Sequence, residues 1–325
     1  MLLQDNLLIF FCCAMVITMK NITNSLALIA EIKNRLLSVY PDPELCQQYA
    51  WWTLQAITDR SHSELVSNPH IPLTEEQKNK LFHWLDALIN AHMPIQYLLG
   101  SVPFADLEIL VKEPTLIPRP ETEEWVLELI QKLLPLRDKK LHILDLCTGT
   151  GCIALALAKA LPEASVLATD ISPDALTLAE KNARHNKVEN ITFLFSNLFD
   201  ALPESHRFDL IVCNPPYIAP EEWKSLDRSV TAWEDERALV AADAGLFLIK
   251  KIIAQAPAYI KVNCLIAEKK IPQLMIEIGH TQAPAVVALM EQAGYTQITT
   301  HIDLEHKNRV VSGRINNVAT TSTAY

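Results

Sequence analysis

Glycine is scarce in this sequence: 7 of its 325 residues are glycine, where average usage would give roughly three times as many. Each glycine therefore needs a reason. Gly149 and Gly151 stand close together, after an apolar run and before an Ala- and Leu-rich stretch. The turn lacks the Lys-Ser/Thr pair of a phosphate-binding loop and does not continue as G-x-G-x-x-G, which excludes the usual triphosphate and dinucleotide sites. It still allows a ligand to approach the backbone closely.

Runs of positive charge are also missing. The chain has 28 Lys and Arg against 38 Asp and Glu, a net charge of −10, and no Lys/Arg run is longer than two residues. Proteins that bind nucleic acids usually carry a basic face. The charge balance therefore argues against direct binding of DNA or RNA.

The apolar run at the N-terminus is too short to cross a bilayer. It covers residues 7–19, whereas a spanning helix needs roughly 20. A secretory signal carries positive charge before its apolar run, and here Asp5 is the one charged side chain upstream. We expect residues 1–18 to be an extension, non-native or disordered, before a functional start at Met19. A membrane-associating helix is the alternative, and no membrane partner is otherwise expected.

The 7 cysteines are odd in number and lack the spacing of metal ligands. Ordinary reduced thiols of this kind are typical of a reducing compartment. We therefore expect a cytoplasmic protein without a metal site.

The most informative feature that is present is the tetrapeptide Asn214-Pro215-Pro216-Tyr217, which follows the apolar run 208–213. Proline has no N–H for a ladder and fixes φ, so a strand must end here, and the residue before a proline is held extended. The result is a rigid strand end that presents an amide, carbonyls and an aromatic ring. It suits a planar group with N–H donors, such as an amide or an exocyclic amine; an ordinary Pro-Pro loop is the alternative.

Two carboxylates stand at the ends of two further apolar runs. Asp145 lies in the run 141–146, just before the glycine turn, and Asp170 ends the run 165–170. Ligands of α/β sheets bind outside the carboxyl ends of the strands, and a carboxylate at the second strand end typically takes ribose hydroxyls. Asp145 disfavours a pyrophosphate and favours a ligand with positive charge. S-adenosylmethionine, which has a sulfonium and an ammonium group, fits; taken singly, each carboxylate could instead be a solvated strand end or a helix entry.

Together these segments resemble the amino-methylating class I S-adenosylmethionine methyltransferases. Within that class, the sequence Leu-Ile-Pro-Arg-Pro-Glu-Thr-Glu at 116–123 resembles the release-factor glutamine methyltransferase family. The tetrapeptide is shared with DNA and RNA adenine methyltransferases, whereas Ile117-Pro118-Arg119-Pro120 is much more specific. The resemblance covers about residues 20 to 314, with further matching segments at 94–100, 237–239, 244–246, 276–279 and 309–314.

The resemblance implies an activity and a partner. A methyl group passes from S-adenosylmethionine, which leaves as S-adenosylhomocysteine, to the side-chain amide nitrogen of the glutamine in the Gly-Gly-Gln motif of peptide chain release factors. The helical N-terminal domain docks that partner, and a monomer is expected. The residues implied to bind the substrate are Asn214, Pro215, Pro216 and Tyr217, with Asn214, Pro215 and Tyr217 in catalysis. Those implied to bind the cofactor are Arg119, Pro120, Asp145, Cys147, Thr148, Gly149, Thr150, Gly151, Asp170, Leu198 and Asn214.

Two of these positions depart from the family pattern. Cys147 stands where the family usually has glycine, and a small residue is tolerated there if its φ is negative. Leu198 stands where some members carry tryptophan.

Two other functions stay open at this point. An adenine-N6 or guanine-N2 nucleic-acid methyltransferase would use the same tetrapeptide but should need a basic groove. A non-catalytic interaction protein on a methyltransferase fold would have no need of Asp145, Asp170 and Asn214, which are all present.

The patterning predicts an α/β fold with a seven-stranded, mostly parallel sheet and a small all-α N-terminal domain, and the resemblance implies that the sheet is the Rossmann-like sheet of methyltransferases. One strand of the sheet is expected to be antiparallel. The predicted organisation is a helical substrate-docking domain at 19–93, a hairpin linker at 94–120, a methyltransferase domain at 121–314 and a disordered tail at 315–325. Strands are expected near 141–146, 165–170, 191–196, 208–213, 274–278, 296–302 and 308–313, with a helix near 283–292 before the last two.

Overall fold

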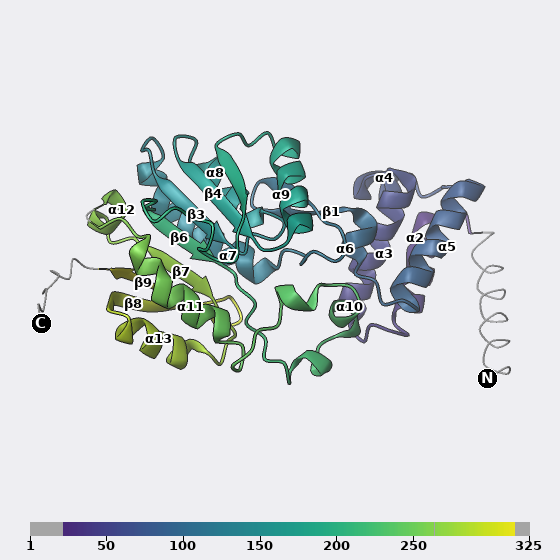
Figure 1. Ribbon diagram of the computed structural model, residues 1–325. Coiled ribbons are helices and arrows are strands. Elements are labelled where there is room, and N and C mark those ends of the chain that lie inside the picture. Colours follow the sequence, from purple (N-terminus) through teal and green to yellow (C-terminus); the bar gives the residue numbers. More distant parts are fainter. Residues whose placement is uncertain (1–21, 263, 316–325) are drawn as a thin grey trace, which may run out of the picture. The chain divides into compact units, whose positions relative to one another are not determined.

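The computed structural model describes residues 22–262 and 264–315. The chain divides into two compact units, Met1–Leu99 and Gly100–Tyr325 (Figure 1). The predicted extension at 1–18 lies outside the described residues, as does the predicted tail at 315–325 except for Ile315, which ends a strand. Within the described part of the chain, no helix is both long enough and apolar enough to span a membrane.

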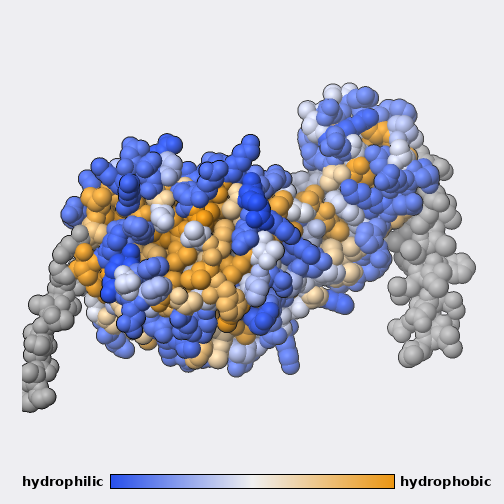
Figure 2. All heavy atoms as spheres, turned by 45° about the horizontal axis from the view of Figure 1, so that its top comes forward, coloured by the Kyte–Doolittle hydropathy of each residue, from blue (hydrophilic) through white to orange (hydrophobic). Residues whose placement is uncertain are grey.

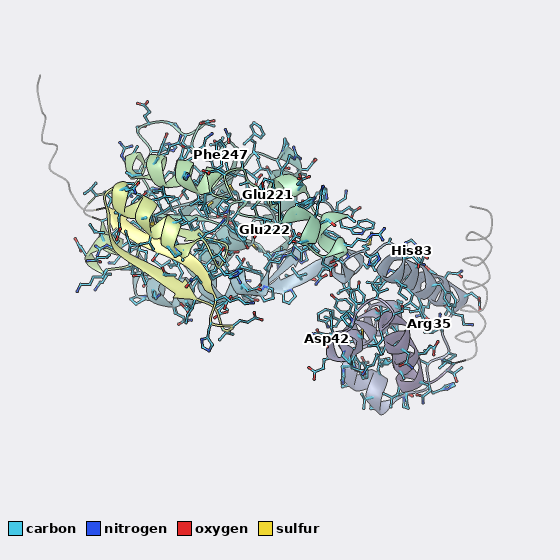
Figure 3. All side chains as sticks on the ribbon, turned by 90° about the horizontal axis from the view of Figure 1, so that it is seen from below. Arg35, Asp42, His83, Glu221, Glu222 and Phe247 are labelled. Carbon is cyan, nitrogen blue, oxygen red and sulfur yellow. The ribbon has the colours of Figure 1, made fainter. Side chains whose placement is uncertain are left out.

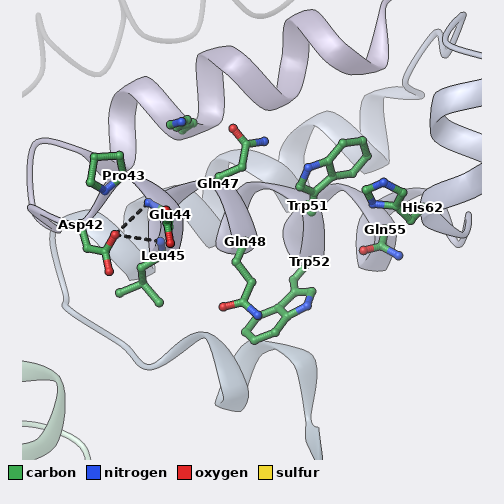
Figure 4. A pocket seen from close by; sticks show the side chains of 11 residues that line it. Asp42, Pro43, Glu44, Leu45, Gln47, Gln48, Trp51, Trp52, Gln55 and His62 are labelled. Atoms are coloured by element: carbon green, nitrogen blue, oxygen red, sulfur yellow. Dashed lines mark hydrogen bonds between the residues drawn. The ribbon is translucent and has the colours of Figure 1, made fainter.

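The first unit is helical, and polar residues that cap helix starts set its boundaries. The side chain of Asp42 accepts the backbone N–H groups of Glu44 and Leu45 at 2.8 and 3.3 Å, drawn as dashed lines in Figure 4. Such caps satisfy N–H groups that the first helical turn leaves free. The helices are α2 (Ser25–Leu36), α3 (Pro43–Thr58), α4 (His62–Ser67), α5 (Glu75–Ile89) and α6 (Ile95–Leu99).

The second unit is built on a seven-stranded sheet in the order β5-β4-β3-β6-β7-β9-β8. β9 runs antiparallel to both of its neighbours, and the remaining neighbouring pairs are parallel. This confirms the predicted α/β class and the mostly parallel sheet. The strands are β3 (His142–Leu146), β4 (Ser165–Asp170), β5 (Ile191–Phe195), β6 (Leu210–Cys213), β7 (Leu274–Glu277), β8 (Tyr295–Ile302) and β9 (Asn308–Ile315); β1 (Ser101–Phe104) and β2 (Leu107–Leu110) form a separate hairpin.

Helices cover both faces of this sheet (Figure 1). The side chains of Leu144, Ile211 and Ile276 share a core with residues of α11 and α13, while Glu277 points to the other face, where it contacts α7. The helices are α7 (Pro120–Leu133), α8 (Cys152–Ala160), α9 (Pro173–His185), α10 (Arg228–Thr231), α11 (Phe247–Gln255), α12 (Leu265–Glu268) and α13 (Ala283–Gln292), with single 3-10 turns at Leu134–Leu136, Trp223–Ser225, Glu236–Ala238 and Ala256–Ala258.

The register of the central strands brings four strand ends to one level. Leu146 of β3 pairs with Thr169 of β4 and with Cys213 of β6, and Cys213 pairs with Ile276 of β7. The residue that follows each member of this row is therefore at the carboxyl edge of the sheet. Those residues are Asp170, Cys147, Asn214 and Glu277.

The chain beyond Tyr217 is fixed by a glycine contact. Gly245 has φ +80°, and a Cβ at this position would lie 1.9 Å from the carbonyl oxygen of Tyr217. Gln282 links the same two segments, since its Nε2 donates to the carbonyls of Tyr217 and Ala244 at 2.9 and 3.0 Å. The intervening loop carries Glu221 and Glu222, labelled in Figure 3. A side chain at Gly245 would thus displace the backbone of the Asn-Pro-Pro-Tyr turn.

We predict that Gly245→Ala lowers the free energy of unfolding by clearly more than Gly294→Ala. Both glycines have positive φ, and Gly294 has nothing within 4 Å of its Cβ position, so its substitution reports only the left-handed backbone cost of about 1–2 kcal/mol. The excess at Gly245 measures the clash with Tyr217. Urea unfolding of the two variants provides the comparison, and equal losses would contradict the prediction.

Candidate active site

The turn between β3 and α8 places backbone N–H groups at the carboxyl edge of the sheet. Gly149 and Gly151 have φ values of +55° and +83°, which glycine adopts without steric cost. A Cβ on Gly151 would lie 3.1 Å from the Cβ of Ala179 in α9. The buried amide of Asn182 donates to the carbonyl of Thr150 at 2.9 Å. The turn is therefore held tightly against α9.

A small residue other than glycine was expected to be tolerated at position 147 only if its φ is negative, and Cys147 does not meet this condition. Its φ is +57°, not negative, so a side chain occupies a left-handed conformation that suits glycine. The condition of a negative φ, on which a small effect of cysteine on the turn was expected, is therefore not met. The cost of such a conformation is about 1–2 kcal/mol, and the thiol also lines the cavity described below.

Asp145 is fully buried beneath the glycine turn. Its Oδ2 accepts the hydroxyl of Thr148 at 2.6 Å, while its Oδ1 has no hydrogen bond of good geometry in the described part of the chain, although the nearby N–H of Ala154 favours the charged form. Burial raises the pKa of Asp145 from 3.8 to about 7, because the charged form loses its hydration. This carboxyl therefore holds its proton more firmly than an exposed aspartate does.

Asp170 is held by the backbone around it. Its Oδ2 accepts the N–H of Gly149 and its Oδ1 accepts the N–H of Ser172, both at 2.8 Å. Burial raises the pKa of its carboxyl, and the two N–H donors oppose that shift. Asp170 thus links the end of β4 to the glycine turn.

A cavity of about 370 Å³ opens at this edge of the sheet. Figure 2 shows apolar side chains gathered on one face of the larger unit, bordered by hydrophilic ones. Sequence-predicted residues in the cavity wall are Cys147, Gly149, Asp170, Leu198, Asn214 and Pro216. The structure brings together residues from four loops that are distant in the sequence.

The other predicted site residues lie behind or beside this wall. Asp145, Thr148, Thr150 and Gly151 belong to the glycine turn and the strand before it, and Pro215 and Tyr217 to the tetrapeptide. Arg119, with Pro120 at the start of α7, is engaged elsewhere: its Nη2 donates to both oxygens of Glu234 at 2.6 and 2.7 Å. Glu234 is buried, so this ion pair ties the segment before α7 to the loop after α10.

Several residues of the cavity wall were not predicted as site residues. Ile171 and Ser172 follow Asp170 directly, Ser196 and Asn197 follow β5, and Asp235 lies beside Arg237. For the first four, the signal is position, since each comes immediately after a strand that was predicted. Asp235 and Arg237 form an ion pair at 2.7 Å; Arg237 begins one of the segments that match the family, whereas the sequence offered no comparable sign for Asp235.

The tetrapeptide itself is tied into the buried side of the sheet. The Nδ2 of Asn214 donates to the hydroxyl of Thr122 at 3.3 Å, and that hydroxyl donates to Glu277 at 2.7 Å. The hydroxyl of Tyr217 donates to the other oxygen of Glu277 at 3.3 Å. Burial raises the pKa of the Tyr217 phenol, so it stays protonated.

A second hollow lies in the helical unit, along α3 (Figure 4). Trp51 and Trp52 line it together with Gln47, Gln48 and Gln55, and Trp51 lies over His62 with ring centroids 3.9 Å apart. Both tryptophans are half-buried.

The first cavity has the chemistry of a site for a cationic ligand and an amide. Asp170, Asp174 and Asp235 line it with one arginine, Arg237, and the unpartnered oxygen of Asp145 lies beneath the turn. S-adenosylmethionine fits this set, because it bears a sulfonium and an ammonium group beside one carboxylate. Among residues 22–262 and 264–315, no cluster of His, Cys, Asp and Glu has the geometry of a metal site.

Comparison with known proteins places the chain in a family. The family model described as "Methyltransferase small domain" matches residues 127–231, and the one described as "PrmC N-terminal domain" matches residues 27–100. A release factor glutamine methyltransferase of Flavobacterium psychrophilum is 36% identical over 280 residues, which cover 85% of this chain and 94% of that protein. Those of Lactococcus lactis and Escherichia coli are each 38% identical, over 82% and 80% of this chain and 92% and 89% of their own length. The chain belongs to the release factor glutamine methyltransferase family.

Proposed function

We propose that the protein transfers a methyl group from S-adenosylmethionine to the side-chain amide nitrogen of the glutamine in the Gly-Gly-Gln motif of peptide chain release factors. The observation that carries the proposal is the position of Asn214, which lies in the wall of the acidic cavity and at the same sheet level as Asp170. Family membership supports the choice of a release factor glutamine as the substrate.

On the cofactor side, the chain offers one carboxylate for the ribose hydroxyls of S-adenosylmethionine and another for its positive charge. Asp170 accepts two backbone N–H groups and retains lone pairs for ribose hydroxyls. Asp145 supplies negative charge beneath the glycine turn. When bound, S-adenosylmethionine supplies a methyl group made electrophilic by its sulfonium charge, and S-adenosylhomocysteine, the product, lacks that charge. No metal is required for this transfer.

On the substrate side, the turn supplies two acceptors and a flat surface. A carboxamide nitrogen is a poor nucleophile because its lone pair is delocalised into the carbonyl. The Oδ1 of Asn214 can accept one N–H of the substrate amide, and the carbonyl of Pro215 can accept the other. As the N–CH₃ bond forms and the S–CH₃ bond breaks, the nitrogen keeps one hydrogen and its second proton is released to water. Tyr217 can pack against the amide plane. Orienting the nitrogen in this way contributes by proximity and alignment, effects worth about 7–11 kcal/mol at best.

The charges around the cavity favour a protein substrate over a nucleic acid. A phosphate backbone would meet Asp170, Asp174 and Asp235 in the wall on a chain of net charge −10. Nucleic-acid binding depends on basic groups that neutralise phosphates. An adenine-N6 or guanine-N2 activity is therefore the outcome that the assay below should exclude.

We expect the protein to label a release factor, and not DNA or RNA, when each is incubated with methyl-labelled S-adenosylmethionine. Asn214→Ala should reduce the labelling by at least a hundredfold, because one acceptor for the substrate amide is lost. Binding of S-adenosylmethionine, measured by calorimetry, should survive, with a loss of affinity of about tenfold at most, because Asn214 is one of several residues implied to bind the cofactor. Labelling of nucleic acid alone would refute the proposed substrate, and full activity of Asn214→Ala would refute the role of the turn.

We expect Asp170→Ala to weaken S-adenosylmethionine binding about tenfold to a hundredfold, since a hydrogen bond to a charged group contributes roughly 1.5–3 kcal/mol. Asp138→Ala is the matched control, because it removes the same charge from an exposed turn. Calorimetric Kd values for both variants provide the test. An unchanged Kd for Asp170→Ala would contradict the assignment to ribose.

Cofactor affinity should rise with pH between about 6 and 8. Asp145, with a pKa of about 7, is mostly neutral at the lower pH and mostly ionised at the higher, so attraction to a cation increases by at most about tenfold per pH unit. Ligand-free stability should change in the opposite sense: the raised pKa favours the protonated folded state, and stability falls as the pH rises from 3.8 toward 7. Asp145→Asn should flatten the affinity profile, and an unchanged profile would exclude Asp145 as its cause.

A further inference from the structure

Glu277 is a buried carboxylate that the reaction does not contact. It ends β7, is 1% exposed, and is not among the residues of the cavity wall. Its Oε2 accepts the hydroxyl of Thr122 at 2.7 Å and the indole N–H of Trp125 at 2.8 Å, and its Oε1 accepts the hydroxyl of Tyr217 at 3.3 Å. Burial raises the pKa of Glu277, while these donors and the nearby positive charge of Arg309 favour its ionised form.

The protons of this network can be assigned from the chemistry of its members. An indole nitrogen only donates, so Oε2 of Glu277 must accept from Trp125. The hydroxyl of Thr122 has one proton, which it gives to the same oxygen, so toward Asn214 it can only accept. The group of Asn214 that lies 3.3 Å from Thr122 must then be Nδ2. The opposite end of the amide, Oδ1, is left to accept.

We propose that Glu277, acting through Thr122, is a positioning residue that fixes which end of the Asn214 amide faces the substrate. This inference rests on the proposed function, in which Oδ1 of Asn214 accepts an N–H of the substrate amide. A flipped Asn214 presents its own N–H groups to the substrate N–H groups, and no hydrogen bond forms between two donors. The same carboxylate holds the hydroxyl of Tyr217, so one buried group sets both side chains of the turn.

The experiment compares two substitutions of Thr122 with a matched control. Thr122→Val keeps the shape but removes the acceptor for Asn214 Nδ2, whereas Thr122→Ser keeps the hydroxyl. Thr53→Val is the control: Thr53 is buried in the helical unit, and its hydroxyl has no hydrogen-bond partner in the described part of the chain. For each protein, kcat and KM for release factor methylation, Kd for S-adenosylmethionine and the thermal unfolding midpoint are measured.

Thr122→Val should lower kcat about five- to thirtyfold, the effect of one hydrogen bond lost at the transition state, with Kd for S-adenosylmethionine unchanged. Thr122→Ser should restore kcat to within about threefold of the wild type, and Thr53→Val should match the wild type. A merely structural role would instead lower the unfolding midpoint and cofactor affinity along with kcat. Wild-type kcat in Thr122→Val, or no rescue by serine, would overturn the proposal.

Glu277→Gln tests the carboxylate itself. Glutamine can still offer one oxygen to Thr122 and Trp125, but it must then direct its NH₂ group at Tyr217. We expect a smaller loss of kcat than in Thr122→Val, because the Thr122 link survives. A loss as large as that of Thr122→Val, with cofactor affinity intact, would show that Thr122 is not the route by which Glu277 acts.

A measurement without turnover separates this inference from the proposed function. In ¹⁵N-labelled protein, the side-chain amide signal of Asn214 should shift in Thr122→Val and stay near its wild-type position in Thr122→Ser and Thr53→Val. An unmoved signal in Thr122→Val would refute the link between the two side chains. If wild-type protein labels no release factor, the proposed function fails, and this signal still decides the orientation of Asn214.

Discussion

The alignment of strand ends is the constraint on which the site depends. Backbone hydrogen bonds pair Thr169, Leu146, Cys213 and Ile276 across four parallel strands. Because the strands are parallel, the residues that follow this row all leave the sheet on the same edge. A shift of one residue in any strand would move its functional group to the other face. The apolar core that fixes this register therefore also fixes the positions of Asp170, Asn214 and Glu277.

Three carboxylates lie near this edge, Asp145 and Glu277 buried and Asp170 half-buried, and they differ in how completely their oxygens are satisfied. Glu277 accepts three side-chain donors, and Asp170 accepts two backbone N–H groups. Asp145 has one donor and one oxygen without a partner. A buried charge without full hydrogen bonding is costly. The difference suits separate roles: the satisfied Glu277 holds other side chains, while Asp145 retains capacity for a ligand of positive charge.

Local patterns were enough to predict the strands, the glycine turn and the strand end at the tetrapeptide, because each of these features depends on neighbouring residues. The apolar runs, the paired glycines and the consecutive prolines all act over a few positions. The contacts that orient the site were not predicted, since they join residues far apart in sequence: Arg119 with Glu234, and Thr122 with Glu277. The positive φ of Cys147 was also missed: the glycine usual in the family at this position is a sign of a left-handed conformation, but the cysteine itself gives none.

Rigidity of the backbone does not by itself orient the group that it carries. Pro215 and Pro216 fix the course of the chain after Asn214, but the terminal torsion of an asparagine side chain is broad and roughly two-fold. Its two ends have nearly the same shape, so packing alone discriminates poorly between them. A hydrogen bond with a fixed donor and a fixed acceptor is therefore needed if Asn214 is to present its oxygen to the substrate rather than its NH₂ group. The hydroxyl of Thr122, whose proton is committed to Glu277, meets that need from behind the cavity wall.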